Sequence, residues 1–358
     1  MQPIDNLRCL LEGGGPEWIP FSLDVGAMPG FTGPVGQTFQ NVTGADDPAE
    51  YFHTDIRSFS LKTRFGGEDP ASLQGPVPPG TTFDEWGIGH LASGTEGTVD
   101  KTFSPLARAT TVEEIESLPS PLIESRVDAS PLERYHARGY PVFGYGGSVY
   151  EWSWWLRGME NFMLDLVSNP AMAEALIRKV EAHTTRLALA SARIGIDVLC
   201  MYDDAGMQRG MQISPDLWRR YVKPVWRRVI EAVRGEAPHV KFFLHNCGKI
   251  DAIIPDVIDV GFDVLHPVQP ECMDFESVYR QYGRDIVVTA TISAQRVFPF
   301  GSPEDVRREV RRLAGIVAAD RRCILLPSNM IQPETPWQNV VAFAEEARAL
   351  RDGTTEPR

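Results

Sequence analysis

The sequence predicts an α/β fold, a closed (β/α)8 barrel (TIM barrel), and two observations predict it. From residue 141 onward, short apolar runs typical of buried strands alternate with amphipathic segments, and no linker interrupts them. This alternation is typical of a parallel sheet covered by helices, and the strand count fits a closed barrel. An open doubly wound sheet is the alternative. The runs are 19–25, 141–147, 198–204, 241–248, 263–269, 285–293 and 323–328.

Several segments between the runs begin like helices, with a hydroxyl residue followed by proline. After the first of these starts, apolar residues four apart form one stripe that can cover a sheet. We expect Pro224 to kink this helix. The three starts are Ser214-Pro215, Ser302-Pro303 and Thr335-Pro336.

The first 140 residues differ from the rest because they are rich in glycine and proline. Residues 35–43 and 81–90 suggest hairpins or long loops rather than βα units. We expect 1–140 to decorate the barrel mouth and complete the barrel, 141–350 to form its main part, and 351–358 to be a frayed tail of the same single domain.

Composition excludes several functional classes. The 358 residues carry 35 basic and 48 acidic side chains, a net charge of −13, which disfavours nucleic acid and anionic membranes as partners. No apolar stretch is long enough for a membrane span, and no signal peptide is evident. Five irregularly spaced cysteines are typical of thiols in a reducing compartment. We therefore expect a cytoplasmic protein. The sequence does not fix the oligomeric state, and a homodimer is one of the possibilities.

The strongest local motif is His245-Asn246-Cys247-Gly248, at the carboxyl end of a predicted strand. Residues two apart on a strand face the same side, so His245 and Cys247 converge if the strand stays extended. Barrel active sites gather at this end, and a His/Cys pair suits Zn²⁺. A buried histidine beside a packed thiol fits these two residues equally well.

Further donors come from neighbouring strand ends. Cys272 follows the next strand and is the third metal candidate, whereas Cys200 and Cys323 read as core thiols. Asp203 and Asp204 end another strand and point to opposite sides, so we expect Asp204 to face the cavity as ligand, hydrogen-bond acceptor or general base. Tying down the loop backbone is the alternative role for this carboxylate.

An aromatic cluster follows the strand that ends near residue 147. Its rings, with Glu151 among them, can wall an apolar pocket or pack as core. His266 ends a later strand. It either lines the cavity, where it is a catalytic candidate together with Asp204, or forms its hydrogen bonds with backbone groups. The predicted substrate-binding residues are Tyr145, Tyr150, Glu151, Trp154, Gln208 and Asn329.

Together, several motifs resemble the uroporphyrinogen decarboxylase superfamily. They are GMENFMLDLVSNPAMAEALI, GIDVLCMYDDAGMQRGMQISPDLWRRYVKP, HNCG, VLHPVQPECMD, TISAQRVFPFGSPEDVRREV and SNMIQPETPWQNVVAF, which span roughly 140 to 345. The resemblance implies a (β/α)8 barrel with a cleft at its carboxyl face. It is strongest to the zinc-dependent corrinoid (cobalamin) methyltransferases, whose His-x-Cys zinc pair matches His245 and Cys247.

Two departures from family patterns refine this resemblance. True decarboxylases carry an arginine-rich RQAGR-type segment for a polycarboxylate substrate, but this chain reads FSLDVGAMPGFTG there. In the coenzyme M branch a cysteine follows LAPG, whereas this chain reads LLPSN and places Asn329 at that position. Cys272, Asp204 or Glu151 would then supply another donor, unless metal binds weakly or not at all.

The leading hypothesis is a methyltransferase that moves a methyl group between a small molecule and a corrinoid, with zinc as Lewis acid. The donor would be methoxylated or of the methylamine type. The chain lacks a D-x-H-x-x-G cobalamin motif, so the resemblance implies a separate corrinoid protein as partner. The alternatives are a metal-free decarboxylase of a small acid that uses Asp204 and His266, and a barrel that only binds a tetrapyrrole or a corrinoid protein.

Overall fold

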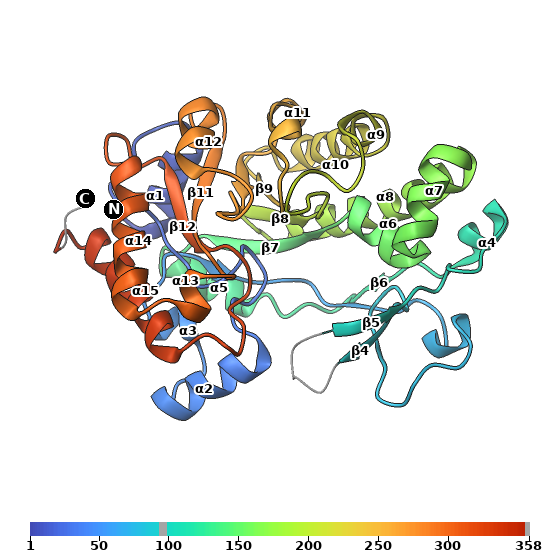
Figure 1. The fold of residues 1–358 in the computed structure, drawn as a ribbon, viewed down its shortest axis with the longest axis horizontal. Helices are drawn as coiled ribbons and strands as arrows, with labels where there is room; N and C mark the ends of the chain where they lie inside the picture. The colour runs from blue at the N-terminus through green and yellow to red at the C-terminus, as the bar shows by residue number, and fades with distance from the viewer. Residues whose placement is uncertain (93–98, 355–358) are drawn as a thin grey trace.

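A parallel sheet of seven strands forms the centre of the molecule (Figure 1). The computed structural model describes residues 1–92 and 99–354. All six predicted strands from residue 141 onward are confirmed. In spatial order the strands are β1 (Arg57–Ser58), β7 (Val142–Gly147), β8 (Val198–Tyr202), β9 (Lys241–His245), β10 (Val264–His266), β11 (Val287–Ile292) and β12 (Cys323–Pro327).

The sheet curls, and an N-terminal segment bridges its two edges. Phe21 pairs in parallel with Leu325 of β12. On its other side, the Phe21 carbonyl accepts a hydrogen bond from the Asp55 amide at 3.0 Å, just before β1 begins. This arrangement fits the predicted barrel better than an open sheet, which leaves two free edges.

Helices cover the outside of the sheet, and their apolar faces bury the main core. The longest, α8, packs against α10 and β7, and α14 packs against α15. The helices along the main part of the chain are α6 (Tyr150–Arg157), α7 (Met159–Ser168), α8 (Pro170–Arg193), α9 (Pro215–Tyr221), α10 (Lys223–Glu236), η2 (Asp251–Ile253), α11 (Ile254–Val260), α12 (Phe275–Tyr282), α13 (Val297–Phe300), α14 (Pro303–Ile316) and α15 (Trp337–Arg351).

A second, smaller core fills the inside of the curved sheet. Successive strand residues point to opposite faces, so each of the strands β7 to β12 contributes to both cores. Phe243 of β9, for example, packs inward against Phe143, whereas Phe242 and Leu244 belong to the outer core. Cys200 and Cys323 are both fully buried, as expected for core thiols.

Helices begin at all three predicted starts, and a hydroxyl caps two of them. The Ser214 hydroxyl caps α9 and the Ser302 hydroxyl caps α14 through the amide three residues ahead. At the third start, α15 begins at Trp337 as predicted, but Pro336 is its N-cap and no side chain caps it, so only the expected cap was wrong. The helix expected to kink at Pro224 is instead two helices, α9 and α10, because a proline in the first turn starts a new helix more readily than it continues one.

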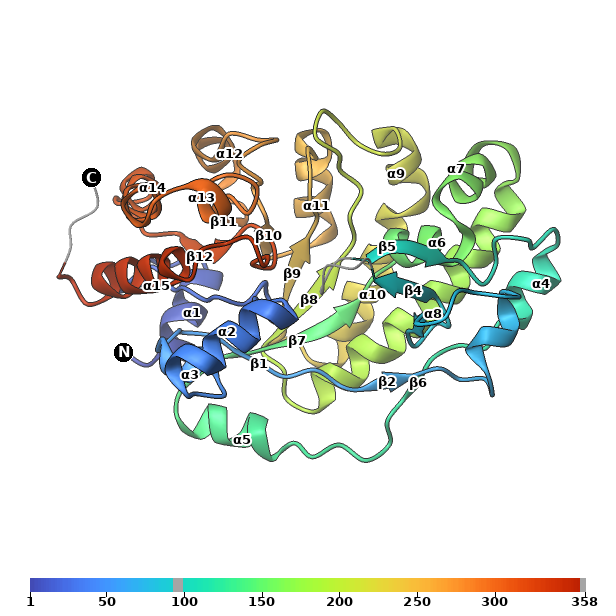
Figure 2. The same cartoon turned by 60° about the horizontal axis from the view of Figure 1, so that its bottom comes forward.

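The N-terminal region contains two small antiparallel sheets beside the barrel (Figure 2). The hairpin predicted at 81–90 is confirmed, since Thr82 pairs with His90. The strands are β2 (Thr63–Arg64) with β6 (Leu122–Ile123), and β3 (Thr82–Phe83) with β4 (Gly89–Ala92) and β5 (Val99–Phe103). The accompanying helices are α1 (Pro3–Leu11), α2 (Gly33–Thr43), α3 (Pro48–Tyr51), η1 (Pro70–Leu73), α4 (Val112–Ser117) and α5 (Ser130–Ala137).

The hairpin or loop expected at 35–43 is wrong, because this segment lies within α2. Proline in the first turn starts the helix and Gly44, with φ of 68°, ends it. Val35 and Phe39, four residues apart, are its buried residues. Packing of this stripe outweighs the weak helix propensity of the glycine and threonine residues.

Two further expectations concern membrane-spanning segments and the C-terminal tail. No helix in the described part of the chain is long and apolar enough to span a membrane. Of the predicted tail, Arg351 still belongs to α15, and 355–358 lie outside the described residues.

Candidate metal centre

The polar groups of the site extend the inward-facing rows of two adjacent strands, β8 and β9. On β8 the row runs through Cys200 and Tyr202, and Asp204 lies two residues further on. On β9 it runs through Phe243 to His245, with Cys247 next. The carboxyl ends of parallel strands meet at one edge, so the fold brings these side chains together, as the sequence predicts.

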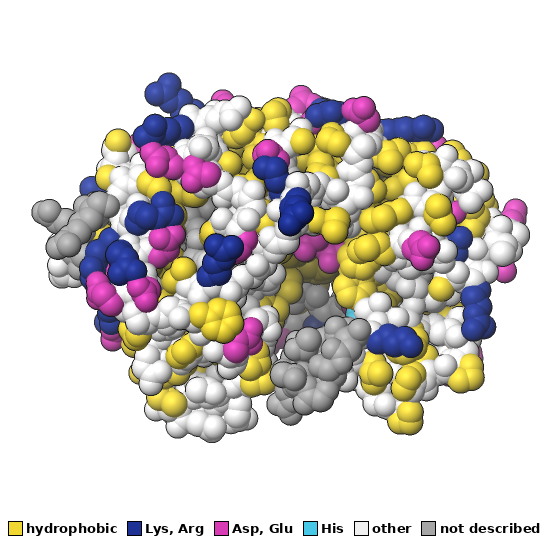
Figure 3. All heavy atoms as spheres, viewed as in Figure 1, with side chains coloured by type: hydrophobic (Ala, Val, Ile, Leu, Met, Phe, Trp, Pro, Cys, Tyr) yellow, Lys and Arg dark blue, Asp and Glu magenta, His cyan; other side chains and the backbone are white. Residues whose placement is uncertain are grey.

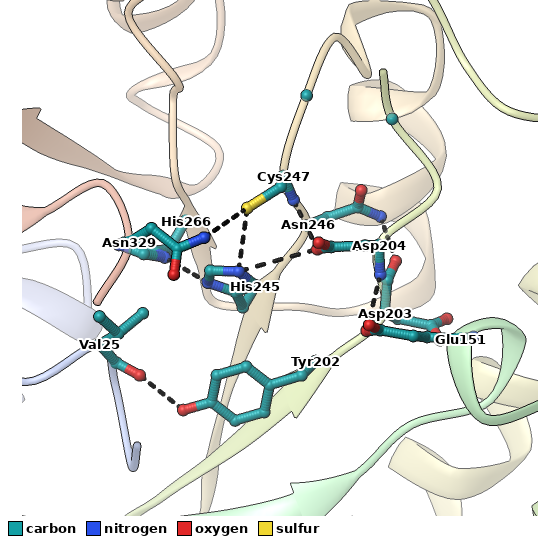
Figure 4. A network of polar contacts seen from close by, with 12 residues as sticks. Val25, Glu151, Tyr202, Asp203, Asp204, His245, Asn246, Cys247, His266 and Asn329 are labelled. Atoms are coloured by element: carbon teal, nitrogen blue, oxygen red, sulfur yellow. Dashed lines mark hydrogen bonds and ion pairs between the residues drawn. The ribbon is translucent and has the colours of Figure 1, made fainter. Parts of the chain in front are cut away.

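Three donor groups converge at this edge (Figure 4). Nε2 of His245 lies 3.2 Å from Sγ of Cys247 and 3.7 Å from Oδ1 of Asp204. Around tetrahedral Zn²⁺, nitrogen, sulfur and oxygen ligands lie about 3.4–3.6 Å apart, given the usual bond lengths. The three side chains therefore fit three corners of a zinc site and leave the fourth corner open. Sequence reasoning paired the histidine with the cysteine and offered Asp204 as one of several further donors, and in the structure Asp204 joins the pair.

A tight loop contact positions Cys247. The Cys247 amide donates to Oδ1 of Asp204 at 2.7 Å, which ties the end of β9 to the end of β8. Gly248 has φ of 85°, and a Cβ there would lie 2.4 Å from the carbonyl carbon of Gly206. Glycine is needed at 248 for both the left-handed conformation and this backbone contact. Cys247 thus reaches His245 although β9 ends at 245.

Burial sets the charge states of the donors. It lowers the pKa of His245 to about 3, so the ring is neutral and its free nitrogen can bind a metal. Burial, followed by the nearby charges of Asp204 and Glu151, raises the pKa of the Cys247 thiol well above its usual value. Burial also raises the pKa of Asp204. A bound cation would oppose these last two shifts.

Glu151 and Asn329 flank the donors. Oε2 of Glu151 accepts a 3.3 Å hydrogen bond from the Asp204 amide, and its Oε1 accepts one from Trp155 Nε1. Burial and the charge of Asp204 raise the pKa of Glu151 well above its usual value. On the other side, Nδ2 of Asn329 donates to Sγ of Cys247 at 3.4 Å. An amide therefore contacts the thiol at the position where the family resemblance suggests a cysteine.

The site opens into a pocket of about 690 Å³. Figure 3 shows the molecule hollowed at its centre, between the half that carries α14 and the half that carries α6. Gln208 and Cys272 lie on the pocket wall, 3.3 Å apart between Oε1 and Sγ. Cys272 is thus not in the cluster of three donors. Asp204, Cys247 and Asn329 also line the pocket, together with Met207 and the exposed ring of Phe300.

Three aromatic residues proposed for substrate binding are not among the described residues that line this pocket. Tyr150 is fully buried, packs against Phe162 and belongs to the core. Trp154 stacks on Trp155, and Tyr145 packs against Tyr202. The apolar character of the segment after β7 therefore reflects packing of α6 as well as any pocket wall.

His266 is also buried, behind His245. Its Nδ1 lies 2.8 Å from Nδ1 of His245, and its Nε2 lies 3.0 Å from the carbonyl oxygen of Pro327. Burial, with a smaller contribution from His245, lowers the pKa of His266 well below its usual value. This histidine contacts a candidate ligand and the backbone and does not line the pocket.

Asp203 is an important residue that sequence reasoning did not assign. It points away from Asp204, as expected for neighbours at a strand end. Its Oδ1 accepts hydrogen bonds from the Ser148 hydroxyl and from the amides of Val149 and Glu151, and its Oδ2 accepts one from Trp226 Nε1 at 2.7 Å. Asp203 thereby fixes the start of α6, and with it Glu151, against β8.

A model of the uroporphyrinogen decarboxylase (URO-D) family matches residues 132–350. This is more than half of the chain, and the protein belongs to this family. The methylcobamide:CoM methyltransferase MtaA of Methanosarcina barkeri is 25% identical over 199 residues, which cover 52% of this chain and 55% of MtaA. The chain thus spans about half the length of this curated relative.

A solved structure of a methyltransferase from Methanosarcina mazei superposes with a TM-score of 0.70. The two share 16% sequence identity over 99% of both chains. This similarity shows that the chain shares the overall fold of that protein.

Proposed function

We propose that this protein is a methyltransferase that moves a methyl group between a small molecule and the corrinoid of a separate protein, with zinc at the candidate metal centre. One observation carries the proposal: His245, Cys247 and Asp204 converge at the carboxyl edge of a URO-D-family sheet, beside an open pocket. The partial similarity to MtaA, whose name states transfer between a methylcobamide and CoM, supports the same class of reaction.

His245, Cys247 and Asp204 would hold the zinc ion. When bound, Zn²⁺ acts as a Lewis acid that stabilises negative charge on the atom that loses the methyl group, or holds an acceptor thiol as thiolate. Catalytic zinc sites use three protein ligands and leave a position for substrate or water, and two of the three residues here, Asp204 and Cys247, line the pocket. Asn329, Gln208 and Cys272 would orient the small molecule, because they present polar atoms along the same pocket wall.

The pocket favours a neutral or cationic small molecule over a polycarboxylate. None of the described residues that line it is lysine or arginine, whereas Asp204 and Glu334 are acidic. At the edge of the barrel where decarboxylases carry arginines, Asp24 accepts hydrogen bonds from the Gly30 amide and the Ser58 hydroxyl. A substrate with several carboxylates would lack charge-matched partners here. The proposed methyl donors, methoxylated or of the methylamine type, have no such need.

A fourth protein ligand should strengthen the site. In the variant Asn329→Cys, a second thiol replaces the amide that now contacts Sγ of Cys247 at 3.4 Å. We expect the zinc dissociation constant to fall at least about tenfold, because an added thiolate closes the tetrahedron. Competition with a chromophoric chelator measures this change, and Asn329→Ser serves as control. An affinity equal to that of the wild type would show that Asn329 lies outside coordination range.

Zinc affinity should depend steeply on pH. The raised pKa of Cys247 means that the thiol keeps its proton in the metal-free protein at neutral pH and must release it on binding. His245, with a pKa of about 3, has no proton to release above pH 5. The dissociation constant should therefore fall by about tenfold per pH unit between pH 6 and 8, because one proton is released. In Cys247→Ser this dependence should flatten, and an equally steep dependence there would exclude the thiol as its source.

The direct test of function is methyl transfer to a reduced corrinoid protein from a panel of methoxylated and methylated-amine donors. We expect formation of the methylated corrinoid, followed by its absorbance, to require both zinc and the protein. Release of CO₂ from a small carboxylic acid without any corrinoid would support the decarboxylase alternative instead. Complex formation with the corrinoid protein that survives loss of Asp204 and Cys247, without turnover of any donor, would support a binding role.

A further inference from the structure

His266 connects the candidate zinc ligand His245 to the barrel backbone. The two histidines are direct neighbours in the register of β9 and β10. Figure 4 shows the ring of His266 on the side of His245 that faces away from Asp204. Its two ring nitrogens contact Nδ1 of His245 at 2.8 Å and the carbonyl oxygen of Pro327 at 3.0 Å.

The Pro327 carbonyl determines where the protons of both rings lie. A carbonyl oxygen only accepts hydrogen bonds, so Nε2 of His266 must carry a proton and donate it. A neutral imidazole has one N–H, and Nδ1 of His266 is therefore an acceptor. The proton shared between the two rings must then belong to Nδ1 of His245. This leaves the lone pair of His245 Nε2 directed at Asp204 and Cys247.

The competing arrangement requires a buried cation. If Nε2 of His245 carried the proton and Nδ1 accepted, His266 would have to donate from both nitrogens and be charged. His266 is completely buried, and within the described part of the chain its ring nitrogens contact only His245 and a carbonyl oxygen. An uncompensated charge in such a place is strongly disfavoured.

We propose that His266 is a positioning residue that holds His245 in the tautomer able to bind a metal through Nε2. Its role toward the ion rests on the proposed function, but the proton arrangement is a property of the metal-free protein. Ligating histidines commonly donate their other ring N–H to an acceptor that fixes ring orientation and tautomer. Here that acceptor is a second imidazole, itself fixed by the last residue of β12.

Ring-nitrogen NMR of the metal-free protein, labelled with ¹⁵N-histidine, tests the proton arrangement directly. We expect the Nδ1–H tautomer for His245 and the Nε2–H tautomer for His266, assigned through His245→Gln and His266→Leu. The opposite tautomer on His245 in the wild type would overturn the proposal. Because no metal is present, this result does not depend on whether the protein proves to be a methyltransferase.

Zinc affinity provides the second readout. In His266→Leu the Nδ1–H of His245 loses its acceptor, and we expect the zinc dissociation constant to rise 10- to 100-fold. His266→Asn should recover most of the affinity, because its Oδ1 stands where Nδ1 of the histidine stood. His183→Leu is the control: His183 is fully buried too, yet neither of its ring nitrogens has a hydrogen-bond partner among the described residues.

Three outcomes of the affinity series are informative. Weaker binding in His266→Leu, with recovery in His266→Asn and wild-type affinity in His183→Leu, supports the positioning role. Affinity within twofold of the wild type in His266→Leu would overturn it. Equal losses of zinc affinity in His266→Leu and His183→Leu would also overturn it, because they would reflect a general effect of replacing any buried histidine. If the wild type binds no zinc, the proposed function fails and the tautomer measurement still decides the proton arrangement.

Discussion

Replacing His245 with alanine is expected to remove the zinc ion and to lower the rate of methyl transfer by at least about 100-fold. The variant loses the nitrogen that lies within 3.7 Å of both other donors. Two remaining ligands hold zinc poorly, and a Lewis acid contributes several kcal/mol to a transition state, which is about two to three powers of ten in rate. Metal analysis and a corrinoid methylation assay measure the two effects.

The control for this variant is another buried histidine outside the site. His183 packs against Trp86 and Trp152 with ring centroids 5.1 and 5.4 Å away. We expect His183→Leu to retain zinc and activity. Full methyl transfer by His245→Ala would contradict the proposed role of the histidine.

Replacing Asp203 with alanine is expected to lower the free energy of unfolding by about 3–5 kcal/mol. The variant leaves four donors without their acceptor, and each buried unsatisfied donor costs about 1–3 kcal/mol. Part of this loss is offset, because burial raises the pKa of Asp203 and the ionised carboxylate is itself disfavoured. Urea denaturation measures the change, and failure to accumulate folded protein is the extreme of the same result.

The neighbouring residue provides the matched comparison. Asp204→Asn keeps an oxygen that can accept from the Cys247 amide, so we expect its stability to stay within about 1 kcal/mol of the wild type. It loses a carboxylate ligand, and its zinc affinity should fall. We thus expect Asp203 to contribute mainly to stability and Asp204 mainly to metal binding. Similar losses of stability in Asp203→Ala and Asp204→Asn would contradict this division.

Most of the strand framework could be predicted because its signals are local. Short apolar runs mark β7 to β12, and the period of two places His245 and Cys247 on one face. The same logic separates Asp203 from Asp204. The segment 35–43 was misread because its composition suggests turns, whereas Val35 and Phe39 become buried only once the rest of the fold is present.

The remaining parts of the site depend on contacts between distant residues. Asp203 accepts from groups 23 to 55 positions away, and His266 contacts Pro327, 61 positions further along the chain. No local pattern encodes such partners. Cys272 was a reasonable third ligand from its place after a strand, but its loop carries it to Gln208 on the pocket wall. Asp204, offered as only one of several further donors, is the one that the strand ends bring within reach.

X-ray absorption at the zinc edge, on protein purified without added chelator, tests the central claim most directly. Coordination by His245, Cys247 and Asp204 predicts one sulfur at about 2.3 Å and two or three nitrogen or oxygen neighbours at about 2.0–2.2 Å. In Cys247→Ala the sulfur shell should disappear, whereas in Cys200→Ala, which removes the core thiol of β8, it should remain. Protein without zinc, or zinc with a sulfur shell that persists in Cys247→Ala, would contradict the account.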